Sequence, residues 1–132
     1  METQEALKLG IGDKALIVLT AKPVKVMGVR VDPKSNKESG KEVGKIVVLI
    51  CEHPDRRTEP LELSKIKTLK NDKTKVSGIW LNLDVDGKIQ LGSPVASLLQ
   101  SANVLTLDEL VGKTLPTVPQ SDSVSYLCIK AY

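Results

Sequence analysis

Five lysines fall within eleven residues of the chain, a stretch that contains only one acid, Asp72. Ammonium groups gathered in this way neutralise phosphates and release the counterions that a nucleic acid carries. Alternation along residues 61–69 predicts that the first two lysines share a strand face, whereas the other three lie at a turn. The alternative is a solvated surface, or charge that protects an edge strand from aggregation. The five residues are Lys65, Lys67, Lys70, Lys73 and Lys75.

Trp80 is the only tryptophan in a chain with very few aromatic residues. It follows Ile79 and precedes Leu81 and Leu83, so an alternating strand would place it on the less apolar face. A nucleic-acid base stacked on an aromatic ring gains about 1–3 kcal/mol. The alternative is a core or barrel-rim tryptophan that anchors the fold, because tryptophan is highly buried on average.

Further basic residues extend the search for a polyanion site. Residues 22–88 hold fifteen basic and ten acidic side chains, so the excess positive charge of the chain, +3 in all, lies in its middle. Arg56 and Arg57 form a second candidate pair, although Asp55 and Glu59 are near enough in sequence to neutralise them. Lys22, Lys25 and Arg30, on an early strand, form a third candidate group.

Residues for catalysis or metal binding do not form a recognisable arrangement. His53 is the single histidine, and a catalytic histidine needs a nucleophile or an orienting carboxylate beside it. Asp84 and Asp86 would share a strand face, but two carboxylates alone make a poor metal site. The glycines are scattered and form no phosphate-binding loop. We therefore expect no enzymatic activity, no metal and no cofactor.

Both cysteines, Cys51 and Cys128, lie in apolar, strand-like segments. Neither belongs to a C-x-x-C pair, which argues against zinc. Two readings stay open, namely two small buried core residues or a disulfide between neighbouring strands.

Strand-like segments fill the first two thirds of the chain. They cover residues 14–32, bent at Pro23, then 45–52, 61–69 and 75–91. Gly28 interrupts an alternating run, which predicts a β-bulge. The polar stretches 33–44, 53–60 and 70–75 are predicted loops or turns. Asp86-Gly87 is typical of a two-residue type I′ hairpin turn.

The segment from residue 88 to 115 contains the clearest local signals. Ser93 and Pro94 predict the start of a short helix near residues 93–101. Thr106 and Glu109 have the spacing of a capping box, and Gly112 closes a helical turn near residues 106–111. Residues 113–119 and 123–132 are predicted as short closing strands.

This order of elements predicts a mainly β fold. No long helix joins successive strands, which disfavours a parallel βαβ architecture. We expect a small antiparallel Greek-key barrel of the oligonucleotide-binding (OB) type, with the short helix near one barrel end. Residues 1–132 are expected to form a single domain, in which residues 1–12 are a loosely ordered lead-in.

The C-terminal third resembles small OB-fold proteins of phages, plasmids and archaeal mobile elements. The resemblance rests on a Leu-Leu helix followed by an L-x-E-L-x-G-K motif and a closing strand. It implies binding of single-stranded nucleic acid, although such binders usually present several aromatic residues. The motif residues are Leu107, Glu109, Leu110, Gly112 and Lys113.

Two functions follow as hypotheses. The first is a non-enzymatic protein that binds single-stranded DNA or RNA through a basic sheet face and loops. The alternative is a structural or protein-interaction module of a virus or mobile element, self-associating as a homodimer through strand edges near residues 126–132. No apolar leader and no run of transmembrane length is visible, so we expect a cytoplasmic protein without a membrane partner.

Overall fold

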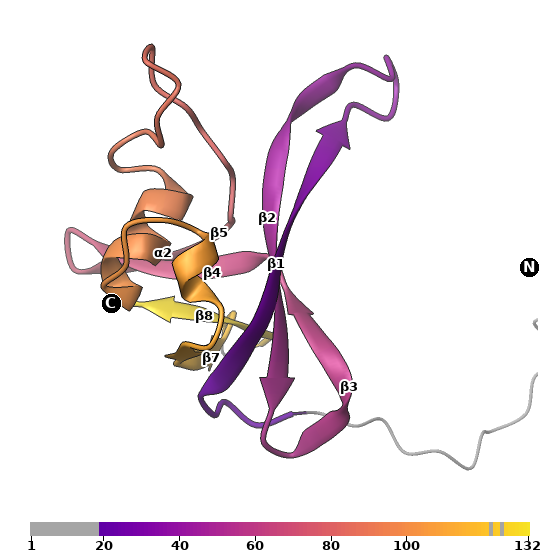
Figure 1. The fold of residues 1–132 in the computed structure, drawn as a ribbon, viewed down its shortest axis with the longest axis vertical. Helices are drawn as coiled ribbons and strands as arrows, with labels where there is room; N and C mark the ends of the chain where they lie inside the picture. Colours follow the sequence, from indigo (N-terminus) through magenta and orange to yellow (C-terminus); the bar gives the residue numbers. More distant parts are fainter. Residues whose placement is uncertain (1–18, 122, 125) are drawn as a thin grey trace, which may run out of the picture.

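A computed structural model describes residues 19–121, 123–124 and 126–132 of the chain, so the predicted lead-in of residues 1–12 lies outside the described residues. Strands account for 51% and helical segments for 11% of these residues, which confirms a mainly β fold. Figure 1 shows a long, strongly twisted hairpin beside a second group of strands and a short helix. None of the helices in the described ranges combines the length and the apolar character needed to cross a membrane.

The first sheet has the order β3-β2-β1-β6 and is antiparallel throughout. Its strands are β1 (Val24–Ser35), β2 (Glu42–His53), β3 (Arg56–Leu63) and β6 (Thr114–Leu115). The register of β1 against β2 shifts between Val26 and Gly28, which confirms the bulge predicted at the glycine. β2 covers the apolar run 45–52, and the consecutive residues Ile46 to Leu49 are all buried, so both faces of the strand are covered there.

The second sheet has the order β5-β4-β8-β7. Its strands are β4 (Lys65–Lys70), β5 (Lys73–Gly78), β7 (Thr117–Pro119) and β8 (Leu127–Ala131). β4 and β8 are parallel, whereas the other two pairs are antiparallel. β8 is paired with β4 on one side and with β7 on the other. The homodimer through strand edges near residues 126–132 stays a prediction.

Two chain segments pass from one sheet into the other. Only Ser64 separates β3 from β4, and only Pro116 separates β6 from β7. Each of these residues therefore marks a bend at which one continuous extended segment leaves the first sheet and joins the second. The tight turn between β4 and β5 is formed by Asn71 and Asp72, whose φ angles of 52° and 62° are those of a type I′ turn.

Within the described ranges one α-helix is present, α2 (Pro94–Ala102), and it forms where the sequence predicts it. The Ser93 hydroxyl accepts a hydrogen bond from the Ala96 amide, and Pro94 occupies the first turn. Asn103 ends the helix in the left-handed conformation. A helix of two to three turns is not stable alone, so the burial of Leu98 and Leu99 against the sheets stabilises it.

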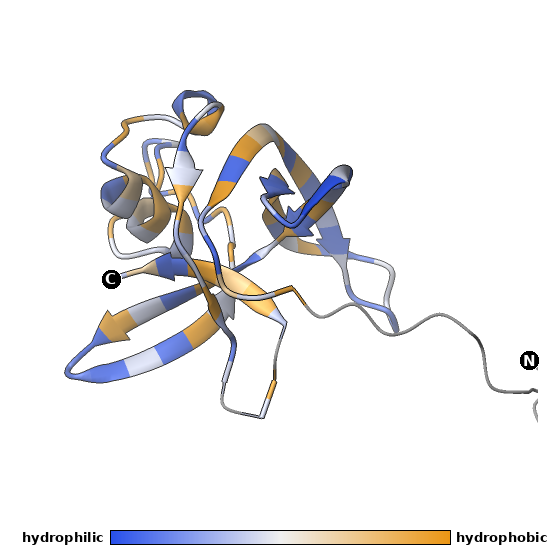
Figure 2. Ribbon diagram, turned by 90° about the horizontal axis from the view of Figure 1, so that it is seen from below, coloured by the Kyte–Doolittle hydropathy of each residue, from blue (hydrophilic) through white to orange (hydrophobic). Residues whose placement is uncertain are grey.

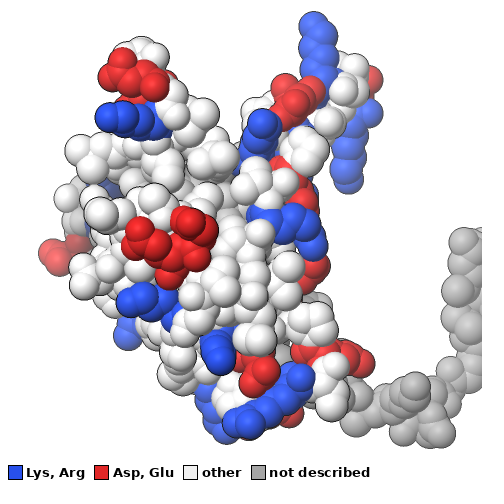
Figure 3. All heavy atoms as spheres, in the orientation of Figure 1, with Lys and Arg blue, Asp and Glu red and all other residues white. Residues whose placement is uncertain are grey.

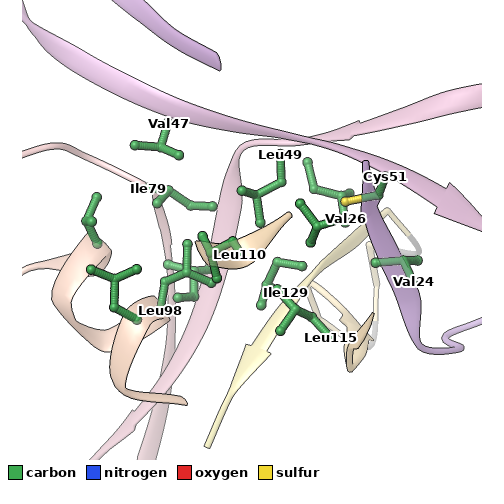
Figure 4. Packing of buried hydrophobic residues seen from close by; sticks show 14 residues of the cluster. Val24, Val26, Val47, Leu49, Cys51, Ile79, Leu98, Leu110, Leu115 and Ile129 are labelled. Atoms are coloured by element: carbon green, nitrogen blue, oxygen red, sulfur yellow. The ribbon is translucent and has the colours of Figure 1, made fainter. Parts of the chain in front are cut away.

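The hydrophobic core lies where β1, β2, β4, β8 and α2 meet, with the 3-10 turn η1 (Asp108–Leu110) at its side. Figure 4 shows aliphatic side chains from these elements pointing toward one another. Both cysteines are free and buried, which confirms the core interpretation and excludes the disulfide. Figure 2 shows hydrophilic and hydrophobic residues alternating along the strands, as expected when one strand face meets the core and the other meets water.

Several local predictions are wrong. Residues 56–60 and 73–75, predicted as parts of loops or turns, lie in β3 and β5. Residues 79–85 do not continue as a strand, because only Trp80 and Leu83 make isolated bridges, and the Val85 side chain is fully exposed. The Asp84 carboxylate instead accepts hydrogen bonds from the Asp86 and Lys88 amides, which curls the chain into a loop. Only Gly87 of the expected type I′ pair has positive φ. Asp84 and Asp86 therefore lie in this loop and do not share a strand face.

The helical turn near 106–111 forms as η1, but without the predicted capping box. Thr106 donates a hydrogen bond to the Asp108 carboxylate, and Glu109 accepts one from the Leu105 amide. The predicted reciprocal pair would instead join each side chain to the other residue's backbone amide. Gly112 follows with φ of 89°, consistent with its predicted role in closing the turn.

Candidate nucleic-acid interface

The indole of Trp80 packs against the backbone at two glycines, Gly44 and Gly78. A Cβ added to Gly44 would be 3.1 Å from Cζ3 of the indole, and one added to Gly78 would be 3.1 Å from Nε1. The indole therefore lies against the backbone at both positions, where any other residue would displace it. Trp80 is partly exposed and is absent from the hydrophobic core cluster. The buried neighbour Ile79 points the opposite way, into the core, as the alternation predicts.

Lys65 shares this side of the sheet with Trp80. It is paired with Gly78 across the β4–β5 hairpin, and paired residues point to the same face. Since the Cβ direction of Gly78 leads to the indole, the Lys65 side chain projects beside Trp80. Lys67, two residues further along β4, points to the same face. The predicted grouping of these two lysines follows directly from this register.

The C-terminal strand contributes residues to the same face. Lys67 is paired in parallel with Lys130, so alternation places Cys128 on its side as well. Tyr132, directly after β8, lies against Lys130, whose ammonium is 5.0 Å from the centre of the ring. Lys65 and Tyr126 jointly line a shallow cleft of about 240 Å³ at the bend between β3 and β4. Tyr126 is 77% exposed and Tyr132 is 49% exposed, so both rings are available to a ligand.

Cys128 lies beneath this surface. Burial raises the pKa of its thiol, while the positive charges of Lys67 and Lys65 oppose the shift. This influence agrees with the register, which places Cys128 on the same face as Lys65 and Lys67. We call this surface the aromatic–lysine face. It comprises Lys65, Lys67, Trp80, Tyr126, Lys130 and Tyr132.

The remaining lysines of the cluster point elsewhere. Lys75 is paired with Thr68, and Lys73 with Lys70, so these three lysines lie on the opposite face of the hairpin from Lys65. β5 is an outer strand of its sheet. Lysines at an exposed edge hinder pairing with another chain, so the edge-protecting role predicted as an alternative fits this group.

Arg30 is held by two carboxylates on the first sheet. Its guanidinium lies 2.8 Å from Asp32 and 2.6 Å from Glu62. The hydrogen bonds that its guanidinium donates to Asp32 and Glu62 raise the pKa of Arg30. Because Arg30 belongs to β1 and Glu62 to β3, the pair spans the intervening strand β2. A phosphate approaching Arg30 therefore meets two negative charges that compete for the same donors.

Lys25, Arg56 and Arg57 lie at the other end of the first sheet. Lys25 is opposite Glu52 on β2, which is six residues, or roughly 20 Å, from the Ile46 position where Trp80 is bridged. Arg57 pairs with Glu52 at 4.0 Å, and Nε of Arg56 is buried with no hydrogen-bond partner among the described residues. The structure does not bring these three residues together with the aromatic–lysine face.

His53 has a structural position near this end. Its Nε2 lies 2.7 Å from the Thr20 carbonyl, and its Nδ1 accepts a hydrogen bond from the Asp55 amide. This pattern requires the tautomer with the proton on Nε2. The Asp55 carboxylate pairs with Lys22 at 3.0 Å, and the hydrogen bond from Lys22 lowers the pKa of Asp55. Both ring nitrogens of His53 therefore make hydrogen bonds to the backbone, at Thr20 and at Asp55.

Sequence reasoning missed Tyr126, Lys130 and Tyr132 as site residues. The signal was present, because residues 126, 128, 130 and 132 alternate with the apolar Leu127 and Ile129. What the sequence did not contain was the parallel pairing of β8 with β4, which places these residues beside Lys67. The three aromatic residues of the chain consequently share one surface rather than being scattered.

Two projecting parts of the chain begin close to Trp80. One is the free end of the β1–β2 hairpin, which begins beside Gly44, and the other is the loop of residues 82–92. Figure 3 shows a hollow between these two parts of the molecule, with acidic and basic side chains at both tips. The loop of residues 36–41 at the hairpin end adds Lys37 and Lys41 to this region.

No protein-family model, no curated protein and no solved structure matches this chain.

Proposed function

We propose that this protein binds single-stranded nucleic acid through the aromatic–lysine face, without catalysing a reaction on it. The observation that carries the proposal is the gathering of Trp80, Tyr126 and Tyr132 around Lys65, Lys67 and Lys130. Proteins that bind single strands combine aromatic rings, on which bases stack, with cations that follow the phosphates. A core of aliphatic residues leaves all three aromatic residues free for the surface.

We infer further that the two sheets form one five-stranded barrel of the OB type. The order of pairing supports this, since β1 pairs with β2, β2 with β3, β4 with β8, β8 with β7, and β6 with β1. If β3 and β4 are counted as one bent strand, and β6 and β7 as another, each of the five strands pairs with two neighbours. The order of pairing then closes into a ring. The parallel contact between the third and fifth strands, and a helix between the third and fourth, agree with the chain order.

The position of the aromatic–lysine face is compatible with such a barrel. OB folds bind oligonucleotides on the face of their second and third strands and on the loops after the first and fourth. In this chain Trp80 bridges the second strand, Lys65 and Lys67 lie on the third, and Tyr126 ends the loop before the fifth. Arg30, which is paired with Asp32 and Glu62, lies at one side of the path expected for the nucleic acid.

Fluorescence anisotropy of labelled single-stranded DNA and RNA oligonucleotides, titrated with the protein at several salt concentrations, tests the proposal. We expect binding that weakens linearly in a plot of log K against log salt concentration. Trp80→Ala should weaken binding about 5- to 150-fold, which corresponds to the loss of about 1–3 kcal/mol of stacking. Trp80→Phe keeps an aromatic ring and should retain most of the affinity.

Three results would count against the proposal. They are the absence of an anisotropy change at low salt, binding that ignores salt, and equal losses for the alanine and phenylalanine variants. A duplex of the same sequence is the matched ligand control, because its bases are not available for stacking and it should bind more weakly. Circular dichroism of each variant shows that the fold is retained.

A further inference from the structure

We propose that the cleft between α2, β4 and β8 binds a single nucleotide, with its phosphate at Lys130 and its base against Tyr132. This inference rests on the proposed function, since the cleft shares Lys130 and Tyr132 with the aromatic–lysine face. The cleft has a volume of about 490 Å³. Ligand sites commonly occupy about 300–1,000 Å³, and a nucleoside monophosphate is a ligand of that size class.

The residues that line the cleft favour a ligand that carries a negative charge and hydrogen-bonding groups. None of the nine lining residues is acidic, and Lys130 supplies a positive charge. Ser97 and Gln100 from α2 and Thr68 from β4 add hydroxyl and amide groups. Among the described residues these three side chains make no hydrogen bond to the protein, whereas Ser101 is already bonded to the Leu98 carbonyl. Donors and acceptors are therefore available to a sugar or to a base edge.

Lys130 and Tyr132 are placed to contact different parts of a nucleotide, namely the phosphate and the base. The Lys130 ammonium lies 5.0 Å from the centre of the Tyr132 ring, within the range of a cation–π contact. This contact keeps the charge beside the ring. Leu69, which also lines the cleft, is 51% exposed and adds apolar surface next to it. A base in contact with the ring and with Leu69 would place its own phosphate near the ammonium.

The cleft is continuous with the proposed strand path. Lys67 and Lys130 are paired in register, so a phosphate backbone contacting Lys65 and Lys67 next meets Lys130. Thr68 lies on the opposite face of β4 from Lys67, so the cleft lies at the end of the sheet, where α2 supplies Ser97 and Gln100. A single strand that follows the face reaches this end at Lys130 and Tyr132, which also line the cleft.

Two-dimensional ¹H–¹⁵N NMR of the labelled full chain tests the inference with the four ribonucleoside 5′-monophosphates as probes. We expect saturable shifts at the backbone amides of residues 97–101 and 130–132 and at the Gln100 side-chain amide. Inorganic phosphate alone should shift Lys130 and Ala131 but leave the Gln100 side chain unchanged. Gln100→Glu replaces an amide that would contact the sugar or the base by a negative charge in the same cleft as the phosphate, and should weaken nucleotide binding roughly fivefold.

The matched control is Gln90→Glu, which makes the same charge change at an exposed glutamine of the 82–92 loop. It should leave nucleotide binding unchanged. Equal weakening by both variants, or nucleotide shifts centred on Trp80 instead of the cleft, would overturn the inference. Oligonucleotide binding without any mononucleotide shift at the cleft would also overturn it, while leaving the proposed function intact. Mononucleotide binding at the cleft without oligonucleotide binding would support the cleft and refute the proposed function.

Discussion

The indole of Trp80 lies so close to the backbone of Gly78 that a Cβ at this position would be 3.1 Å from its Nε1. The same Cβ would be 2.6 Å from Cδ1 of Ile46, a separation that real structures essentially never show. Gly78 therefore keeps space for two side chains at once. Because Gly78 has no side chain, the indole packs directly against the backbone. The glycine therefore determines how far the proposed stacking surface stands out from the sheet.

Gly78→Ala should destabilise the protein by about 1–3 kcal/mol, because the added methyl group must displace Ile46 or the indole. Urea denaturation followed by tryptophan fluorescence measures this change. Gly28→Ala is the matched control, since its Cβ would lie 3.7 Å from Ile50 Cδ1, an ordinary contact. Equal destabilisation by the two substitutions would show that Gly78 is not a packing constraint. A shift in the emission maximum only for Gly78→Ala would confirm movement of the ring.

Much of the fold could be predicted because its signals are local. Ser93 and Pro94 determine the start of α2 through one hydrogen bond and one fixed backbone angle. Gly28 marks its bulge in the same way. Alternation also placed Lys65 and Lys67 on one face correctly, although Lys70, Lys73 and Lys75 lie in strands β4 and β5 and not in the turn. Each of these features depends on residues within a few positions of one another.

The errors arise where distant or competing contacts decide. Residues 79–85 alternate like a strand, but the Asp84 carboxylate binds nearby amides and ends the extended segment. The pairing of Arg30 with Glu62 joins residues 32 positions apart, and no sequence pattern indicates it. Likewise, the contribution of Tyr126 to the candidate site depends on the β4–β8 pairing, which joins the middle of the chain to its end.

Cys51 should make the stability of the protein depend on pH in alkaline solution. Burial raises the pKa of its thiol from an ordinary value of 9.0 to about 12. Below about pH 9 the thiol is protonated in both the folded and the unfolded chain, so it adds no pH dependence. Between about pH 9 and pH 12 only the unfolded chain releases the proton, and the free energy of unfolding falls by up to about 1.4 kcal/mol per pH unit.

Urea denaturation at a series of pH values, on the protein and on Cys51→Ala, measures this effect. The variant loses packing contacts at every pH, so the slopes are compared and not the absolute stabilities. Lysines and tyrosines titrate in both proteins, and their contributions cancel in the difference. We expect the shallower decline above about pH 9 in the alanine variant. Parallel curves would show that the thiol ionises equally easily in the folded chain.

The two groups of lysines should differ in their effect on binding. Replacing Lys65 and Lys67 together by alanine removes two proposed phosphate contacts, so the slope of log K against log salt should fall by about 1.4, or about 0.7 per contact. Replacing Lys73 and Lys75 together removes the same charge from the opposite side of the hairpin. This second variant should keep the original slope. Equal reductions would indicate that net charge, not the aromatic–lysine face, determines binding.

Glu62 should limit the affinity for nucleic acid, because it occupies Arg30 at 2.6 Å and lines the cleft that Lys65 and Tyr126 share. Glu62→Gln removes this negative charge and leaves a guanidinium hydrogen with room for a phosphate. We therefore expect tighter oligonucleotide binding and a slope of log K against log salt that is steeper by about 0.7. Glu59→Gln makes the same charge change at an exposed residue of β3, outside both clefts, and is the matched control. If both variants tighten binding equally, the effect comes from net charge alone. If Glu62→Gln weakens binding while the fold is retained, the Arg30–Glu62 pair organises the site instead of competing with the ligand.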